Sequence, residues 1–533
     1  MQTADYVIVG AGSAGAVLAN RLSEDPATSV ILIEAGGEAR NWLVELPVGF
    51  AKMVANGKYD WCYEQQPDPS INGRHFIWSG GRMLGGSSSI NGQVYIRGTR
   101  RDFDRWAELG AAGWDYEGVL PYFMRSEDWR GPPGQGRGSH GPLTVSPQRD
   151  PHPLCRVFLA GCDEFGLPTL ADYNAGGAME GAFLTVGSQR DGWRCSTEKG
   201  YLRPARNRPN LTILTQAEVE RVRIVDGRAV GVTLSRGGAR QDVDARNDVI
   251  LSAGAMGTPA LLMRSGIGPG AYLQSRGIAV IHDSADVGRN LQEHPAVLQH
   301  KFCSRTTLNS QTGPIHMALH MARFLLGKKG PLVAPAVQAM GLTRTDPALD
   351  EPDIQLHFLP FAYDLEAETV SSAAAAFPKA PAVTIAVSLC HPKSRGRVEL
   401  EADGRPRIVH ELLGDNRDLD TLVAAVKLAN RLFQTPSLAG IVTGDRTPRT
   451  LPATDEGWAD YVRSKAMPSY HPVGTCRMGS DAGAVVDPQL RVRGLAGLRI
   501  ADASIMPSLP SGNTNAASIM IGEKAADLIA AAA

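Results

Sequence analysis

A glycine-rich segment near the amino terminus has the residue types and spacing of a dinucleotide site. Residues 10–15, Gly-Ala-Gly-Ser-Ala-Gly, fit the pattern GxGxxG, follow the apolar run 6–9 and open the helical pattern 16–22. In that setting the first glycine permits a tight turn, the second lets backbone N–H groups reach a pyrophosphate, and the third lets the helix pack on the strand. The helix N-terminus would face the anion. We therefore predict an adenine dinucleotide here.

A carboxylate suited to the ribose follows the second predicted strand. The apolar run 29–33 ends at Glu34, where a carboxylate can bond ribose hydroxyls and would repel a 2′-phosphate. This position favours the unphosphorylated dinucleotide. A second GxGxxG, at residues 136–141, lies in a polar Gly/Pro loop with no strand before it, so we interpret it as a surface loop.

A second glycine-rich segment helps to choose between NAD and FAD, which share the fingerprint. Residues 81–91 read Gly-Arg-Met-Leu-Gly-Gly-Ser-Ser-Ser-Ile-Asn. A flexible linker would need neither Arg82 nor Asn91. A glycine pair with hydroxyls and an amide instead offers bare, donor-rich backbone to a diphosphate and a flavin ring.

Two long motifs resemble the signatures of the glucose-methanol-choline (GMC) oxidoreductase family. Residues 81–95 are similar to the first signature and residues 254–268 to the second. The resemblance continues through 287–295 and 501–507, and covers essentially the whole chain except a loosely matching middle part. Bacterial choline dehydrogenases and sorbose dehydrogenase-like alcohol dehydrogenases look nearest. The resemblance implies FAD-dependent oxidation of an alcohol, with hydride transfer to the flavin.

The resemblance implies an α/β fold in which separated segments build two domains. A Rossmann-like FAD-binding domain is expected from residues 1–150, 195–300 and 465–533. A substrate-binding domain, an antiparallel sheet flanked by helices, is expected from residues 151–194 and 301–464. Residue patterns agree with a mixed fold: alternation predicts strands at 210–215, 218–225, 382–389 and 396–400, the last two in one antiparallel sheet, and helical spacing appears at 418–433.

The resemblance also implies which residues contact FAD. Asp502 could simply cap a helix, but the family suggests contact with the ribityl-phosphate region, and the backbone of Val219 is expected beside the adenine. Ile90 stands where covalently flavinylated choline oxidases carry a histidine, so we expect FAD without a covalent link. The implied set is Gly10, Gly12, Ser13, Ala14, Gly15, Glu34, Ala35, Arg82, Leu84, Gly86, Ser87, Asn91, Gly92, Val94, Val219, Ala253, Asp502, Ala503, Asn513 and Thr514.

Alcohol oxidation needs a base at the hydroxyl and a second polar group to hold it. His471, in a segment matching the family's catalytic-histidine motif, is the expected base, because a reference pKa of about 6.5 leaves imidazole neutral near pH 7. The family's second catalytic position falls on Asn513, which can position a hydroxyl but cannot act as a base. Asn515 is the competing amide. His294 is expected to be structural.

Metal binding and structural disulfides are not expected. A zinc site at His471 and Cys476 lacks further ligands at usable spacing. The seven cysteines are scattered, odd in number and without a CxxC pair, which favours a reducing compartment.

Substrate and acceptor preferences depend on three positions. The resemblance places Gln338 where choline-oxidising members carry a glutamate facing the trimethylammonium group, and Tyr470 beside the substrate. We therefore expect a neutral primary alcohol, aliphatic or aromatic, rather than choline. Ser469 replaces the apolar residue that good oxidases place near the flavin, which favours a dehydrogenase that uses a quinone, dye-like or protein acceptor over oxygen. The alternatives are an oxygen-using alcohol oxidase of the same family, a flavin-containing lyase, and a non-enzymatic dinucleotide-binding sensor.

Length and composition frame these expectations. A chain of 533 residues is too long for one ordinary core. Its net charge of −1 predicts no affinity for nucleic acid or anionic membrane. No run of about 18 apolar residues predicts a transmembrane helix, and the amino-terminal residues lack a signal-peptide pattern. The expected location is the cytoplasm.

Overall fold

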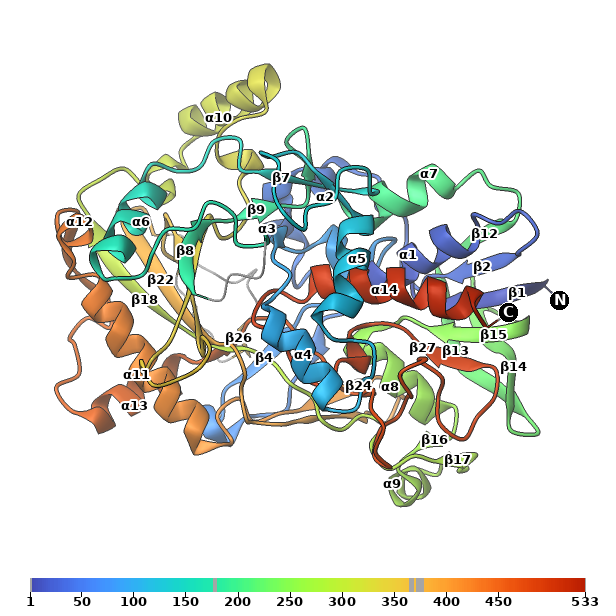
Figure 1. The fold of residues 1–533 in the computed structure, drawn as a ribbon. Coiled ribbons are helices and arrows are strands. Elements are labelled where there is room, and N and C mark those ends of the chain that lie inside the picture. Colours follow the sequence, from blue (N-terminus) through green and yellow to red (C-terminus); the bar gives the residue numbers. More distant parts are fainter. Residues whose placement is uncertain (1, 176–179, 364–368, 371–377, 533) are drawn as a thin grey trace.

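Two large sheets organise the protein. A computed structural model describes residues 2–175, 180–363, 369–370 and 378–532. Figure 1 shows the first sheet around β1 (Gln2–Val9), near both termini, and the second around β18 (Pro295–Cys303) and β22 (Ala382–Leu389), on the opposite side of the molecule. The expected mixed α/β architecture is confirmed.

The first sheet is the dinucleotide-binding sheet expected from the glycine motif. Its strand order is β12-β2-β1-β15-β14-β13, with β27 beside β15. The pairings of β1 with β2 and β15, of β12 with β2 and of β27 with β15 are parallel, and those around β14 are antiparallel. Every residue of β2 is buried, as expected for a parallel strand covered on both faces. The strands not yet bounded are β2 (Val30–Ile33), β12 (Leu211–Leu214), β13 (Ala217–Val225), β14 (Arg228–Arg236), β15 (Ala239–Leu251) and β27 (Leu498–Ile500).

Helices α1 (Ser13–Leu22) and α14 (Asn515–Ala530) pack together beside this sheet (Figure 1). Glu523 on α14 is fully buried and accepts hydrogen bonds from Arg21 on α1 and from Arg125 at the end of α5 (Tyr116–Ser126). A buried carboxylate with a cationic partner on each of two other helices fixes the relative position of the three, because moving them apart would leave the buried charge uncompensated.

The second sheet is antiparallel, with the order β25-β18-β22-β20-β19-β8 and β26 beside β18. Helix α11 (Asn416–Leu432) packs on β18 and β22 and confirms the helical spacing at 418–433. The strands not yet bounded are β8 (Gly181–Leu184), β19 (Ala339–Thr343), β20 (Ile354–Leu359), β25 (Val442–Thr447) and β26 (Met467–Pro468). The longer helices not yet bounded are α4 (Arg100–Glu108), α6 (Leu154–Glu164), α8 (Gly254–Arg264), α9 (Gly270–Ser275), α10 (Pro314–Gly327) and α13 (Asp455–Lys465).

Two expectations about the second sheet need correction. Strand β22 pairs with β18 and β20, whereas β23 (Arg397–Leu400) pairs only with β24 (Pro406–Val409) in a separate hairpin, so 382–389 and 396–400 do not share a sheet. The expected segments 195–300 and 465–533 also include most of β18 and all of β26, which both belong to the second sheet. Alternation predicts that a strand exists but not which strand it pairs with.

Two smaller points concern the chain's other sequence patterns. Residues 136–141 adopt neither helix nor strand, as expected for a loop, but the loop is not wholly on the surface: Arg137 and Gly138 are buried and hydrogen-bonded to the buried carboxylate of Glu127. Within the described residues, no helix has both the length and the apolar character needed to cross a bilayer.

Candidate active site

A cavity of about 980 Å³ lies where the two sheets meet. Its walls include the carboxyl ends of β1, β2 and β15, through Val9, Ile33 and Ser252, which is where open α/β sheets bind their ligands. Residues from the second sheet and its connections complete the wall, Leu359 and Met467 among them. The cavity is at the upper end of the volumes usual for ligand pockets and is large enough for a dinucleotide.

One end of the cavity is built from backbone. Gly10 has a φ of +97°, and a Cβ there would lie 2.5 Å from the carbonyl oxygen of Ser252. Gly86, at a φ of +50°, approaches Gly12 so closely that its Cβ would lie 2.7 Å from the Gly12 Cα. Neither α1 nor α14 has a side chain capping its first turn, so both N-termini keep free N–H groups at the cavity wall. Such an arrangement suits a diphosphate.

Glu34 stands beside this backbone cradle. One of its carboxylate oxygens accepts from the N–H of Ala11 (2.9 Å) and the other from the N–H of Gly36 (2.8 Å). Burial raises the pKa of Glu34 to about 7, against these two donors, which lower it. The carboxylate lines the cavity and retains lone pairs for further donors such as ribose hydroxyls.

The segment 81–94 crosses the cavity wall as the sequence predicted. Gly86, Ser87, Asn91, Gly92 and Val94 all line it. Arg194, whose side chain is buried, supports the segment from behind: its guanidinium donates to the Ser88 carbonyl (3.1 Å) and to Asn91 Oδ1 (2.8 Å). Sequence analysis missed Arg194, because no local pattern marks an arginine that acts through tertiary hydrogen bonds.

Unpartnered polar atoms in the wall are consistent with a polar ring system such as a flavin. Gln93 lines the cavity, is 1% exposed and has a φ of +65°, yet neither atom of its amide has a partner among the described residues. The Oδ1 atom of Asn513 is equally unpartnered. A buried amide without partners costs about 1–3 kcal/mol, which a bound ligand with complementary atoms would remove. The residues present therefore fit FAD.

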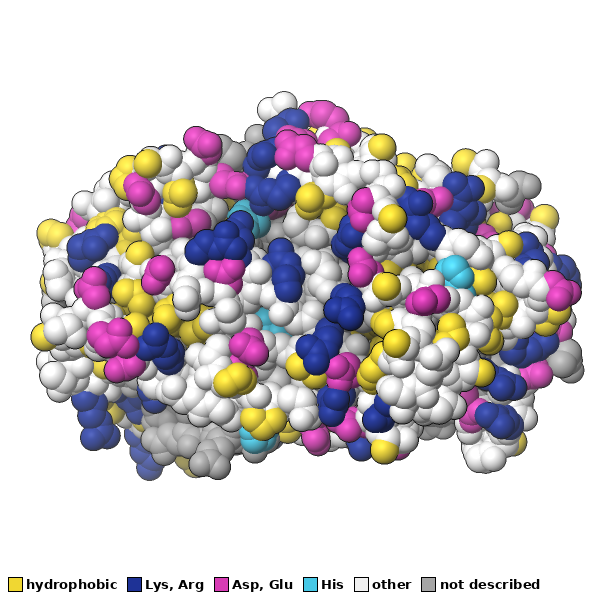
Figure 2. Space-filling model, turned by 90° about the horizontal axis from the view of Figure 1, so that it is seen from below, with side chains coloured by type: hydrophobic (Ala, Val, Ile, Leu, Met, Phe, Trp, Pro, Cys, Tyr) yellow, Lys and Arg dark blue, Asp and Glu magenta, His cyan; other side chains and the backbone are white. Residues whose placement is uncertain are grey.

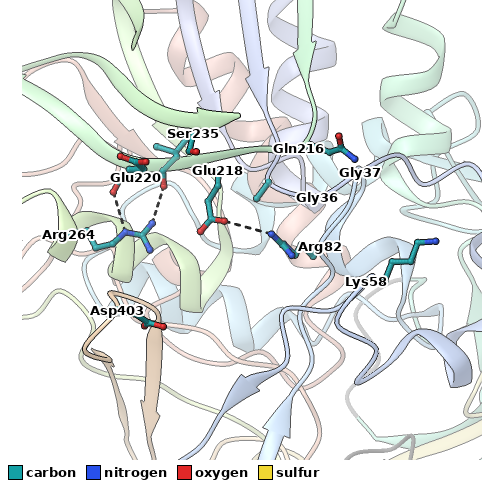
Figure 3. A pocket seen from close by; sticks show the side chains of 12 residues that line it. Gly36, Gly37, Lys58, Arg82, Gln216, Glu218, Glu220, Ser235, Arg264 and Asp403 are labelled. Atoms are coloured by element: carbon teal, nitrogen blue, oxygen red, sulfur yellow. Dashed lines mark hydrogen bonds and ion pairs between the residues drawn. The ribbon is translucent and has the colours of Figure 1, made fainter. Parts of the chain in front are cut away.

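A polar vestibule of about 640 Å³ adjoins the cavity at Val219 (Figure 3). Arg264, at the end of α8, donates to the carbonyls of Val219 (3.0 Å) and Glu220 (3.2 Å). Arg82 lies here, 3.7 Å from the carboxylate of Glu218. This places Arg82 and the Val219 backbone at the end where the adenine was expected, with charged groups at the rim.

The opposite end of the cavity carries the predicted catalytic pair. Asn513 Nδ2 lies 2.8 Å from His471 Nε2, and both residues line the cavity. Asn515 instead donates to Ser13 Oγ (2.7 Å), near the diphosphate cradle. The structure therefore brings Asn513, and not Asn515, to the histidine.

A second histidine fixes the tautomer of the first. His294 Nε2 lies 3.1 Å from the carbonyl oxygen of Cys390, which can only accept, so this nitrogen carries a proton. Burial holds the pKa of His294 well below its usual value, which leaves the ring neutral and its Nδ1 a bare acceptor. His471 Nδ1, 3.0 Å away, must then be the donor. The network thus assigns the lone pair of neutral His471 to Nε2, the atom facing Asn513.

The backbone of His471 is also held firmly. Its N–H donates to both carboxylate oxygens of Glu293 (2.9 and 2.7 Å). Burial raises the pKa of Glu293 to about 8. Burial also lowers the pKa of His471 to about 3, with electrostatic interaction with His357 as a smaller cause. His471 is therefore neutral at any physiological pH. Glu293 and His294 follow one another in a family-like motif, which was the only signal of their role.

Three predicted contact residues line neither the cavity nor its vestibule. Gly15 packs against β1 instead, with its Cβ position 1.9 Å from the Gly10 oxygen, as its packing role requires. Leu84 is buried behind the wall, where its N–H donates to Gly37. The expectation that Gln338 faces the substrate is wrong. Its side-chain oxygen accepts from the His152 N–H (2.8 Å), while its neighbour Val337 faces the cavity. Successive side chains of an extended chain point to opposite sides.

Asp502 caps a short helix, as one of its two expected roles requires, while its contact with the ribityl-phosphate region stays a prediction. Its Oδ1 caps the short helix η8 (Ala503–Ile505) at Ser504 N, and its Oδ2 accepts from Gly254 N (2.9 Å) at the start of α8. Asp502 also lines the cavity. In the described part of the chain no group of three metal-ligating side chains comes together. The remaining implied residues that line the cavity or its vestibule are Ser13, Ala14, Ala35, Ala253, Ala503, Thr514 and Tyr470.

Comparison with known proteins gives this geometry a family. Two models described as GMC oxidoreductase match the chain, one over residues 4–296 and the other over residues 392–522. An alcohol dehydrogenase (acceptor) of Pseudomonas putida is 38% identical over 98% of this chain and 95% of that protein. An oxygen-dependent choline dehydrogenase of Sinorhizobium medicae is 39% identical over 99% of this chain and 95% of that protein.

Solved structures agree with the sequence comparison. Pyridoxine 4-oxidase from Mesorbium loti superposes with a TM-score of 0.89 at 32% identity, over 98% of both chains. A fungal aryl-alcohol oxidase gives a TM-score of 0.82 at 26% identity, over 99% of both chains. Fold, glycine cradle, histidine pair and relatives agree: the chain belongs to the GMC oxidoreductase family, binds FAD and is an oxidoreductase that acts on CH–OH donors.

Proposed function

We propose that this protein oxidises a neutral primary alcohol, aliphatic or aromatic, to its aldehyde and passes the electrons to an acceptor other than oxygen. The single observation that carries the proposal is the His471–Asn513 pair in the wall of the cavity, with the lone pair of His471 on Nε2. FAD, when bound by the backbone cradle and the 81–94 segment, would supply the two-electron acceptor at the carbon that is oxidised.

The two side chains would divide the work at the hydroxyl group. His471 Nε2 accepts the hydroxyl proton, because it is the only ring nitrogen of that residue without one. Without a substrate, the Asn513 amide occupies the His471 Nε2 lone pair. A bound alcohol would take its place there, so that the hydroxyl hydrogen points to Nε2 and an Nδ2 hydrogen of Asn513 turns to the alcohol oxygen. Glu293 and His294 act as positioning residues that hold the backbone and the ring.

A neutral substrate is favoured by the wall near this pair. The described cavity-lining residues from 336–337, 359–363 and 467–472 are aliphatic, aromatic or hydroxyl-bearing apart from His471, and none is a carboxylate. A quaternary ammonium desolvated there would meet the rings of Phe361, Tyr363 and Tyr470, which return about 2 kcal/mol by cation–π contact, but it would lack a counter-charge, whose absence costs several kcal/mol. This argument replaces the one based on Gln338, which faces away.

The acceptor preference depends on Ser469. It lines the cavity two residues before His471, with its hydroxyl 3.5 Å from that of Ser388. A hydroxyl pair at this place offers oxygen no dry apolar niche, which favours a quinone, dye-like or protein acceptor. The named relatives include both an acceptor-linked and an oxygen-dependent enzyme, so the acceptor must be measured.

Anaerobic mixing of the yellow holoenzyme with an alcohol panel tests the reaction. Bleaching by benzyl or straight-chain alcohols is expected, whereas a lyase or a sensor would stay yellow. Steady-state assays with choline and with neutral alcohols, each with oxygen alone or with an artificial acceptor, then test the two preferences. Choline giving the highest kcat/KM would overturn the substrate proposal, and rapid oxygen consumption with a neutral alcohol would overturn the acceptor proposal.

The same preparation tests how FAD is held. Ile90 is buried in the cavity wall and cannot form a covalent link to the flavin. Acid precipitation should therefore leave the yellow colour in the supernatant. Colour that stays in the pellet would contradict a non-covalent cofactor.

A further inference from the structure

Helix α10 (Pro314–Gly327) is oriented against the usual rule for a surface helix. Of its 14 residues only His320 and Phe324 are buried, and Figure 1 shows the helix projecting from the edge of the molecule. A surface helix normally turns its apolar stripe to the core and its charged stripe to water. The outward side of α10 is instead apolar.

The outward stripe is continuous. Ile315, Leu319, Ala322 and Leu326 follow the spacing i, i+4, i+7, i+11 and share the side opposite His320 and Phe324. Ile315 is 76% and Leu326 is 91% exposed. Six of the twelve exposed large hydrophobic side chains of the described residues lie on this one helix. Single exposed leucines need no explanation, but a contiguous patch marks an interaction surface.

Another face of the protein provides the contrast. Seen from below in Figure 2, basic and acidic side chains are interspersed and hydrophobic side chains are scattered in small groups, as on an ordinary protein surface. Two exposed hydrophobic side chains outside α10 serve as reference positions: Val225, the last residue of β13, is 54% exposed, and Ile281, just before β17 (His282–Asp283), is 53% exposed.

Helix α10 carries no acidic residue and has basic side chains at its end, although the chain as a whole is nearly neutral. Between Glu293 and Asp346 the sequence has no acidic residue, while Arg323, Lys328 and Lys329 cluster at the end of the helix. The Lys328 ammonium lies over the ring of Trp193, and Arg323 is bonded to Asp150. An apolar stripe ending in a basic cluster is typical of helices that lie in the interface of an anionic bilayer.

The residues on which α10 packs are followed in the chain by residues of the cavity wall. Phe324 packs with Leu332 and Val333 of η6 (Pro331–Val333) and with Leu46, which precedes η1 (Pro47–Gly49). The residues that follow each support, 50–54 and 336–337, contribute to the cavity wall. A surface that α10 contacts would thus lie against the wall of the alcohol site.

We propose that α10 is an interfacial membrane anchor that seats the protein on an anionic bilayer. The helix can lie in the interface but cannot span it, since 14 residues extend about 21 Å against a hydrocarbon core of about 30 Å. A second copy of this chain fits less well. In an isologous contact each basic helix end would meet a copy of α10, which carries no acidic residue, so Lys328 and Lys329 would find no ion-pair partner on the facing helix.

Flotation of the FAD-loaded protein with vesicles tests the anchor. Vesicles of phosphatidylcholine mixed with phosphatidylglycerol should carry the wild type upward, and phosphatidylcholine alone should carry it weakly. Combined Ile315→Glu and Leu326→Glu should lower the partition coefficient at least roughly tenfold, because two apolar anchors become charged. Lys329→Glu should lower it roughly fivefold or more on the anionic vesicles only.

The matched control is combined Val225→Glu and Ile281→Glu, which adds the same charge at apolar positions elsewhere that are 54% and 53% exposed, against 76% and 91% for Ile315 and Leu326. It should bind vesicles like the wild type. Equal losses in both double variants, or no vesicle binding by the wild type, would overturn the proposal. A wild-type dimer that the α10 variant converts to a monomer, without vesicle binding by either, would assign the surface to a second copy instead.

Flavin reduction by alcohol, measured without vesicles, keeps this test separate from the proposed function. None of the substituted residues lines the cavity, so all variants should retain FAD and the wild-type reduction rate. If no alcohol reduced the flavin, the proposed function would fail but the vesicle result would be unaffected. If the protein did not bind vesicles, the anchor proposal would fail but the flavin-reduction result would be unaffected.

Discussion

The two ends of the cavity are built in different ways. The dinucleotide end consists of closely packed backbone: a Cβ at Gly10 would lie 2.5 Å from the Ser252 oxygen, and a Cβ at Gly86 would lie 2.7 Å from the Gly12 Cα. The His471 end consists of side chains from separate segments, joined by hydrogen bonds. A site made of backbone depends on the absence of atoms, whereas a site made of side chains depends on particular donors and acceptors. A substitution at the backbone end should therefore lower FAD binding, whereas a substitution at the side-chain end should lower the rate of flavin reduction.

The largest effect is expected from Gly15→Ala at the backbone end. A Cβ there would lie 1.9 Å from the Gly10 carbonyl oxygen, so α1 must move away from β1. Such overpacking against backbone costs about 3 kcal/mol or more. The purified variant should contain less than about a tenth of the wild-type FAD and melt at a lower temperature. Gly37→Ala is the control, because nothing lies within 4 Å of its Cβ position. Equal FAD content in both variants would contradict the argument.

The next effect is expected at the side-chain end, and there FAD should stay bound. His471→Ala should lower alcohol-dependent flavin reduction by roughly 10²–10⁴, the usual contribution of a positioned base, without changing FAD content. Asn513→Ala should have a smaller effect, because it removes a donor and not the base. Stopped-flow absorbance under anaerobic conditions measures both. Reduction at nearly the wild-type rate in His471→Ala would remove His471 from its proposed role.

A smaller effect is expected behind His471. His294→Phe removes the acceptor of the His471 Nδ1 proton, so the ring loses its fixed tautomer. We expect flavin reduction to slow roughly tenfold to a hundredfold with FAD retained, by analogy with other positioning residues that hold a catalytic ring. His294→Asn, whose amide oxygen can accept, should recover part of the loss. A rate unchanged in the Phe variant over the whole pH range would show that the tautomer needs no fixing.

The smallest effect concerns stability against acid. The folded-state pKa of His471 is lowered from 6.5 to about 3, so below pH 6.5 the unfolded chain binds a proton that the folded chain refuses. Above pH 6.5 the titration of His471 therefore does not lower the free energy of unfolding. As the pH falls from 6.5 toward 3, this titration lowers the free energy of unfolding progressively. The His471→Gln variant has no titrating group at this position, so its stability does not show this pH-dependent loss. Relative to the wild type it should gain up to about 1.4 kcal/mol per pH unit below 6.5.

Melting temperatures of the wild type and His471→Gln at pH 7.5 and pH 5 measure this difference. The variant's melting temperature should rise relative to the wild type on acidification. An offset that stays constant with pH would mean that His471 titrates normally in the folded state.

The chain's own sequence determined the dinucleotide end almost completely. A strand, a tight turn and a helix bring residues 6–22 together within one local unit, and side-chain and turn preferences act over that range. For the same reason the helix at 418–433 and the strand at 382–389 could be predicted from periodicity alone. Identification of His471 and Asn513 needed the family resemblance, because one histidine among 12 has no local mark of catalysis.

Only the tertiary structure decided how the catalytic end works. His294 lies 177 residues from His471 in the chain, and the proton that fixes the tautomer depends on the Cys390 carbonyl, which belongs to a third segment. Gln338 could not be placed from sequence, because a shift of one residue along an extended chain turns a side chain from the cavity to His152. The same holds for α10: its periodicity predicts an apolar stripe, but only packing decides that the stripe faces outward.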